Sequence, residues 1–155
     1  MANFTATVDS PVGRFGVSGA EAGVTQILLP SDRPRASAGR APAPVAEAAR
    51  QLTAYLLGER RGFDLPLAEV DATPFQRDVW DALREIPYGE VRTYAEVAAL
   101  VGRPLAARAV GNANHHNPWP VVVPCHRVVA ANGLGGYGGG DTVKRYLLGL
   151  EGVSR

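Results

Sequence analysis

Apolar and polar side chains alternate in the first third of the chain, at residues 4–8 and again at 15–17. Turn-forming residues at 9–13 separate the two runs, and a third apolar run over 24–29 stops at Pro30. An alternation of period two is typical of strands with one buried face. The pattern therefore predicts three strands in this part of the chain.

A loop and a helix are predicted next. Residues 31–44 are rich in Pro, Arg, Ala and Ser, and we expect them to form a surface loop. From 45 to 57 the apolar residues recur at helical spacing, and Gly58 marks the end of that helix. Residues 63–67 alternate again, which predicts a short closing strand. The stretch 70–74 is a candidate domain boundary.

The spacing of apolar residues becomes helical in the second half. Thr73 followed by proline is a strong helix start, and the apolar positions predict a helix that reaches Ile86. Thr93 caps a second predicted helix over 94–101, and a third follows over 105–114 after a break that contains Gly and Pro. Two short helices joined in this way are typical of a helix-turn-helix. Plain helix packing is the alternative, because the alanines of the third helix are also the best helix formers.

The last third combines an apolar run, a glycine-rich stretch and a final helix. Residues 121–123 predict a buried strand that leads into Cys125. Residues 132–140 predict a glycine-rich loop, which lacks the Gly-Lys-Ser/Thr ending of phosphate-binding loops. Apolar residues at helical spacing predict a final helix over 142–150.

Composition narrows the class of protein. The 155 residues suffice for one domain or two small ones, and 46% hydrophobic residues support a core. The one cysteine excludes an intrachain disulfide and a multi-cysteine zinc site, and the three histidines lack metal-motif spacing, so we expect no metal. Because neither a signal peptide nor a membrane-length apolar run is evident, we expect a cytoplasmic protein without membrane contact.

The net charge of +1 does not by itself indicate nucleic-acid binding. Charge is nevertheless uneven, because the stretch from Gly102 to Gly140 carries Arg103, Arg108 and Arg127 and no acidic side chain. This local surplus favours an anionic partner, with solvated surface arginines as the alternative.

The single cysteine, Cys125, is the candidate reactive group. It is followed at once by His126 and Arg127. A thiol attacks as the thiolate, and a neighbouring imidazole or cation can lower its pKa. The alternative is an inert, buried cysteine that behaves as a small hydrophobic residue.

Taken together, these residues resemble the O6-alkylguanine-DNA alkyltransferases, also called methylated-DNA–protein-cysteine methyltransferases. Six pieces occur in the order and spacing of that family and cover nearly all of residues 73–152. They are 73–76 with 79–80; 87–91 with 93–94; 106–111; 117–118 with 120; 124–129; and 136–137 with 139–140, 144, 147–148 and 151. The hexapeptide 124–129 is highly specific by itself, whereas the N-terminal half fits more loosely.

The resemblance implies an α+β fold in two domains. Residues 1–70 would form a small antiparallel sheet with a helix, as in ribonuclease H, and residues 73–155 a helical domain with a winged-type helix-turn-helix. The second domain would bind DNA and transfer the alkyl group. The zinc of some family members is not carried over, because this chain lacks the cysteines for it. No cofactor is expected.

The resemblance also implies a reaction. It is DNA repair by direct, irreversible transfer of an alkyl group from O6 of guanine in duplex DNA to Cys125 after base flipping, with O4 of thymine as an open second substrate. Cys125 is the nucleophile and acceptor, His126 the base through a water, and Glu151 the group that orients the imidazole. Asn117 holds the preceding turn. Each molecule would react once, as a methyltransferase that is consumed by its substrate.

Further residues are implied for DNA and for the extruded base. Arg108 would fill the vacated stack and Tyr94 would move the phosphate and bond the base, with Ala107 and Arg127 as further DNA contacts. The partner is double-stranded DNA that contains alkylated guanine, and the protein is expected to act as a monomer. The walls of the guanine pocket are assigned to Tyr94, Pro120, Val128, Tyr137 and Gly138.

Two other functions compete with repair. Alkyltransferase-like proteins bind lesions without repairing them, but they replace the cysteine that this chain retains at Cys125. A thiol hydrolase would need an oxyanion hole and a histidine distant in sequence, whereas His126 is adjacent to the cysteine.

Overall fold

The computed structural model describes residues 3–137 and 140–153. The chain forms two compact units, Met1–Val70 and Asp71–Arg155, which we call unit 1 and unit 2. Sheet and helices occur together, which confirms the predicted α+β class. No helix within the described ranges has the length and apolar character needed to cross a membrane.

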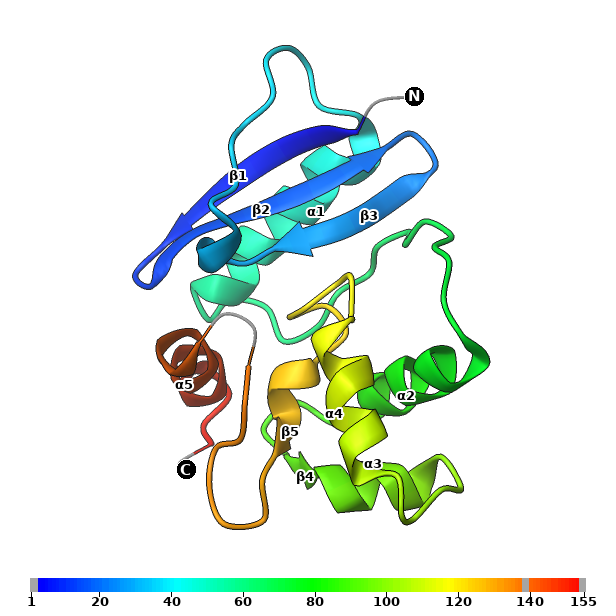
Figure 1. The fold of residues 1–155 in the computed structure, drawn as a ribbon. Helices are drawn as coiled ribbons and strands as arrows, with labels where there is room; N and C mark the ends of the chain where they lie inside the picture. Colours follow the sequence, from blue (N-terminus) through cyan, green and yellow to red (C-terminus); the bar gives the residue numbers. More distant parts are fainter. Residues whose placement is uncertain (1–2, 138–139, 154–155) are drawn as a thin grey trace. The chain divides into compact units, whose positions relative to one another are not determined.

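Unit 1 is a three-stranded antiparallel sheet with one long helix packed against it (Figure 1). The strands lie in the order in which they occur along the chain, and the three predicted runs are confirmed. Val8 pairs with Phe15, and Val17 pairs with Ile27. The elements are β1 (Phe4–Ser10), β2 (Gly13–Ala20), β3 (Gly23–Leu28), a 3-10 turn η1 (Pro30–Asp32) and α1 (Ala43–Leu56).

The core of unit 1 lies between the sheet and α1. Phe15 and Val17 of β2 are fully buried, as are Val45 and Leu52 of α1. Burying such side chains contributes roughly 1.5–3 kcal/mol each. The alternation read in the sequence therefore does place the apolar face of the sheet against the apolar face of the helix.

The predicted strand at 63–67 is wrong, except for a single bridge between Leu67 and Val24. Pro66 has no N–H group, so it can accept a bond from the Val24 N–H but cannot continue a ladder. The segment is attached to α1 instead, because the Gln51 amide donates to the Asp64 carbonyl at 3.0 Å and accepts from the Asp64 N–H at 2.9 Å.

Within the described residues, unit 2 contains four α-helices. The first two begin at capping boxes, in which Thr73 pairs with Gln76 and Thr93 pairs with Glu96. Each box satisfies two backbone N–H groups that a helix start leaves without partners. The Trp80 indole donates to the Ala113 carbonyl at 2.9 Å and so links the first of these helices to the third. The helices are α2 (Pro74–Arg84), α3 (Tyr94–Leu100), α4 (Ala107–His115) and α5 (Asp141–Leu150).

A two-stranded parallel sheet connects distant parts of unit 2. It consists of β4 (Arg92–Thr93) and β5 (Val128–Val129), with Arg92 opposite Val128 and Thr93 opposite Val129. Strand β4 runs directly into α3, and β5 directly follows the 3-10 turn η2 (Cys125–Arg127). The pairing therefore brings the start of α3 beside the cysteine segment (Figure 1).

The predicted strand at 121–123 is a buried turn. Val121 has a positive φ of 77°, which is unfavourable for a β-branched residue and incompatible with a strand. Asn117 stabilises the turn, because its side-chain amide donates to the Val123 carbonyl at 2.8 Å and accepts from the Trp119 N–H at 2.9 Å. The bonds from the asparagine side chain replace those of a sheet.

Candidate active site

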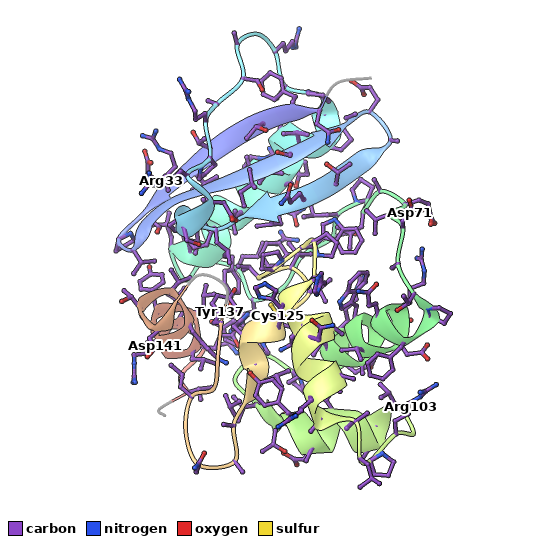
Figure 2. The ribbon with its side chains drawn as sticks, in the orientation of Figure 1. Arg33, Asp71, Arg103, Cys125, Tyr137 and Asp141 are labelled. Carbon is purple, nitrogen blue, oxygen red and sulfur yellow. The ribbon has the colours of Figure 1, made fainter. Side chains whose placement is uncertain are left out.

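Cys125 is the first residue of η2 and lies inside unit 2 with 5% of its surface exposed (Figure 2). Hydrogen bonds hold both its backbone N–H and its backbone carbonyl. The Cys125 N–H donates to the Val123 carbonyl at 2.7 Å, and the Asn114 side chain donates to the Cys125 carbonyl at 3.3 Å. The thiol is therefore presented from a rigid turn between α4 and β5.

His126 is fully buried, and its Nε2 atom lies 2.8 Å from a carboxylate oxygen of Glu151. Twenty-five residues separate the two in sequence. A carboxylate at this distance orients the ring and makes Nε2 the protonated nitrogen of a neutral imidazole. Nδ1 is then the nitrogen that can take up a proton.

Arg127 is not at the surface, so its predicted DNA contact is corrected. Its guanidinium forms two bonds to the Glu151 carboxylate, at 2.7 and 3.0 Å, and a third to the Ile86 carbonyl at 2.7 Å. It also lies 5.7 Å from the centre of the Tyr88 ring. A bidentate pair is the geometry in which a buried arginine is best satisfied, and it leaves this side chain committed to Glu151.

Lys144 is a site residue that was not predicted from the sequence. It is fully buried, and its Nζ donates to the Val128 carbonyl at 2.7 Å and the Gly136 carbonyl at 3.1 Å. It thereby connects α5, β5 and the glycine loop. A signal was available, because Lys144 stands three and four residues before Leu147 and Leu148, on the apolar face of α5. Asn114 was missed too, and its place on the inner side of α4 carried no comparable signal.

The electrostatic environment keeps both reactive groups neutral in the resting site. Burial raises the pKa of the Cys125 thiol, while a hydrogen bond from Asn117 and the charge of Lys144 act in the opposite direction. Burial likewise lowers the pKa of His126, against the effect of Glu151. Desolvation disfavours the charged form of each group. The arrangement therefore suits a thiol that is activated only when its substrate is in place.

Two tyrosines approach the thiol from different elements. Tyr94 begins α3, and its hydroxyl donates to the Gly136 carbonyl at 3.4 Å. Burial raises its pKa, with a smaller effect from nearby Cys125. Tyr137 lies close enough to the thiol to lower the pKa of Cys125, and the centre of its ring lies 5.9 Å from the Lys144 ammonium. A Cβ on Gly135 would lie 3.0 Å from the Tyr94 hydroxyl, which explains the glycine there.

The other predicted residues are divided between the interior and the surface. Val128 and Pro120 are buried near η2, the first within β5 and the second bridged to Val123. Arg108 is exposed and Ala107 half-buried at the start of α4. Gly138 lies outside the described residues. A grouping of three or more His, Cys, Asp or Glu side chains able to hold a metal does not occur in the part of the chain that the structure covers.

Comparison with known proteins identifies the family. Residues 74–153 match the DNA-binding domain of 6-O-methylguanine DNA methyltransferase, and residues 3–68 match the ribonuclease-like domain of the same enzyme. The matched ranges span most of unit 2 and unit 1, respectively. The ribonuclease-like and DNA-binding matches confirm the predicted fold of each half.

Relatives match over nearly the full chain. A methylated-DNA–protein-cysteine methyltransferase of Mycolicibacterium paratuberculosis is 47% identical over 94% of this chain and 90% of its own length. A constitutive one of Bacillus subtilis is 42% identical over 98% and 97%. The solved structure of Mycobacterium tuberculosis OGT in complex with DNA is 44% identical, with a TM-score of 0.83 over 96% of this chain and 92% of that one. The chain thus belongs to the 6-O-methylguanine DNA methyltransferase family.

Proposed function

We propose that this protein repairs DNA by moving an alkyl group from O6 of guanine to the Cys125 thiol. The observation that carries the proposal is the buried thiol next to a His126–Glu151 pair, within a unit that matches the DNA-binding domain of the family. Relatives that cover nearly the whole chain are named methylated-DNA–protein-cysteine methyltransferases.

The transfer is a single displacement at carbon. The Cys125 sulfur forms a bond to the alkyl carbon while the bond from that carbon to guanine O6 breaks, and the electron pair remains on the base. The thiol proton passes through a water to Nδ1 of His126, because Nε2 is engaged by Glu151. The departing guanine takes up one proton, and His126 gives up the thiol proton through water, so that the net transfer is of one proton from the thiol to the base. The products are ordinary guanine and a neutral thioether.

Stabilisation of the thiolate falls to Asn117 and Lys144. The first bonds the sulfur and the second places a positive charge near it, and both lower the pKa of Cys125. Arg127 acts indirectly, because its bidentate pair holds the Glu151 carboxylate in position for His126. A preorganised charge is worth more in a buried site than in water.

The base must leave the helix to reach a thiol that is 95% enclosed. We assign α4 to the DNA, with Ala107 permitting close approach and Arg108 filling the gap left in the stack. Tyr94 moves the phosphate and bonds the extruded base, which its place between α4 and the glycine loop supports. The resemblance assigns the walls of the base pocket to Tyr94, Pro120, Val128, Tyr137 and Gly138.

The reaction is stoichiometric, since a thioether is stable and the thiol is the chain's only one. All residues assigned a role lie in unit 2, so we propose residues 73–155 as the part that binds DNA and transfers the alkyl group. A lesion-binding protein without repair activity is not favoured, because Cys125 is present and linked to the proposed network. Action as a monomer in the cytoplasm, where DNA is accessible, remains our expectation.

Intact-protein mass spectrometry after incubation with a duplex that contains O6-methylguanine tests the proposal. Wild-type protein should gain the mass of one methyl group, located on Cys125 by peptide mapping, and the lesion should disappear in equal amount. Cys125→Ala should gain nothing. Thermal unfolding of that variant shows whether it is folded.

Persistence of the lesion beside folded, unmodified wild-type protein would exclude repair and favour lesion binding alone. A second turnover per molecule would exclude the stoichiometric mechanism. Asp9→Asn serves as a control. It breaks an exposed ion pair with Arg14 in unit 1, and the variant should react like the wild type.

A further inference from the structure

Leu105 is the most exposed large apolar side chain of the described chain, at 100%. It lies in the turn between α3 and α4, the connection of the helix-turn-helix. Leu100, the last residue of α3, is also 63% exposed. Single exposed leucines are common on protein surfaces, but Leu105 lies two residues before α4, the helix that the proposed function assigns to DNA.

The turn that carries Leu105 is rigid. The Gly102 and Arg103 N–H groups donate to the Ala99 and Ala98 carbonyls, and the Ala106 N–H donates to the Arg103 carbonyl, at 2.9–3.0 Å. Arg103, labelled at this turn in Figure 2, also lies 5.6 Å from the centre of the Phe75 ring of α2. Leu105 is thus held out by a fixed backbone, so that only its side chain, and not the turn, must be ordered on binding.

The surroundings of Leu105 are complementary to DNA. Arg103 and Arg108, both exposed, flank it on either side, and no aspartate or glutamate occurs from residue 102 to residue 137. An apolar side chain between cations suits the edge of a duplex, where apolar sugar faces alternate with phosphates. Apolar side chains, leucine among them, are known in protein–DNA interfaces, where some proteins wedge them between base steps; a residue at the edge of the duplex would meet the sugars instead.

We propose that Leu105 makes an apolar contact with the deoxyribose faces of duplex DNA and contributes affinity that does not depend on salt. The inference rests on the proposed function and specifies one part of its DNA interface. Contacts to phosphates release counterions and weaken with salt, whereas an apolar contact does not. The two kinds of contact can therefore be separated by experiment.

The test is fluorescence anisotropy with a labelled, undamaged duplex at several salt concentrations, so that no alkyl transfer occurs. Leu105→Ala should bind about fivefold more weakly, by the same factor at every salt concentration. Leu105→Lys should instead steepen the slope of log affinity against log salt by about 0.9. Because Leu105 is fully exposed, both variants should unfold at the wild-type temperature.

Leu57→Ala is the matched control, since Leu57 is 64% exposed but belongs to unit 1. If Leu105→Ala binds DNA as tightly as this control, the inference is overturned. It is also overturned if the loss comes with a shallower salt slope, or if sedimentation reveals a Leu105-dependent dimer while DNA affinity is unchanged. Wild-type protein that binds no DNA at all would instead overturn the proposed function.

Discussion

The ammonium group of Lys144 lies inside unit 2, although lysine is rarely buried. It donates to the Val128 and Gly136 carbonyls. The loss of hydration on burial nevertheless disfavours the charged form and lowers the pKa of Lys144 from 10.5 to about 8. Lys144 is also the only lysine in the chain. Its protonation can therefore be followed without interference from any other lysine.

We predict that a protein labelled with 13C-lysine shows one side-chain Cε signal that titrates with a midpoint near pH 8. Above pH 8 the unfolded chain binds a proton at this group that the folded protein has lost, so the free energy of unfolding rises with pH up to 10.5. Relative to Lys144→Met, the wild type should gain on the order of 1 kcal/mol between pH 8 and pH 9 in urea unfolding. A midpoint above pH 10 would contradict this.

At the scale of elements, Thr93 has two functions. It is the last residue of β4, which pairs with β5, and its hydroxyl accepts from the Glu96 N–H at 3.1 Å to cap α3. The Glu96 carboxylate in turn accepts from the Thr93 N–H at 2.8 Å, and these bonds lower the pKa of Glu96. The cap therefore fixes where α3 begins and hence where Tyr94 stands.

Removing this cap with Thr93→Ala should lower the free energy of unfolding by about 1 kcal/mol, whereas Thr93→Ser should restore most of it. Urea unfolding measures both. Thr53→Ala is the control, because the Thr53 hydroxyl bonds the Ala49 carbonyl within α1 and caps no helix. Equal losses in Thr93→Ala and Thr53→Ala would argue against a specific capping effect.

At the scale of the molecule, the Glu151 carboxylate links segments of unit 2 that are far apart in sequence. It accepts hydrogen bonds from His126 and Arg127 of η2, and Arg127 also donates to the carbonyl of Ile86, which lies just after α2. The adjoining turn is tied in too, because the Tyr88 hydroxyl donates to the Leu150 carbonyl at 2.9 Å. Loss of the carboxylate should consequently affect both the chemistry and the stability of the unit.

Glu151→Gln should reduce the free energy of unfolding by about 3 kcal/mol, because it leaves the Arg127 charge buried without its counterion. Alkyl transfer should slow as well, since His126 loses the group that favours its protonated form. Asp9→Asn breaks an exposed pair with Arg14 and should cost less than about 1 kcal/mol. Chemical unfolding and single-turnover rates measure these effects, and equal costs for the two variants would contradict the prediction.

Much of the fold follows from local patterns. Alternation located β1, β2 and β3, and the helical period with threonine caps located α1 to α5 within a few residues. The two failures, at 63–67 and 121–123, have alternating or continuous apolar residues that are half-buried in the first segment and mostly buried in the second, each with a single bridge in place of a strand. In each, a side-chain amide, Gln51 or Asn117, supplies the bonds that a neighbouring strand would have supplied.

The sequence alone determined the family resemblance, the candidate nucleophile Cys125 and its neighbour His126, because spacing and residue type are local properties. Tertiary structure decided which other side chains lie beside Cys125 and His126. Only the parallel pairing of β4 with β5 brings Tyr94 to the cysteine turn, and only the return of α5 places Glu151 and Lys144 there. The structure also shows that Arg127 pairs with Glu151 and not with DNA. A buried guanidinium needs a counterion close in space, and the sequence does not reveal which residues 24 positions away lie that close.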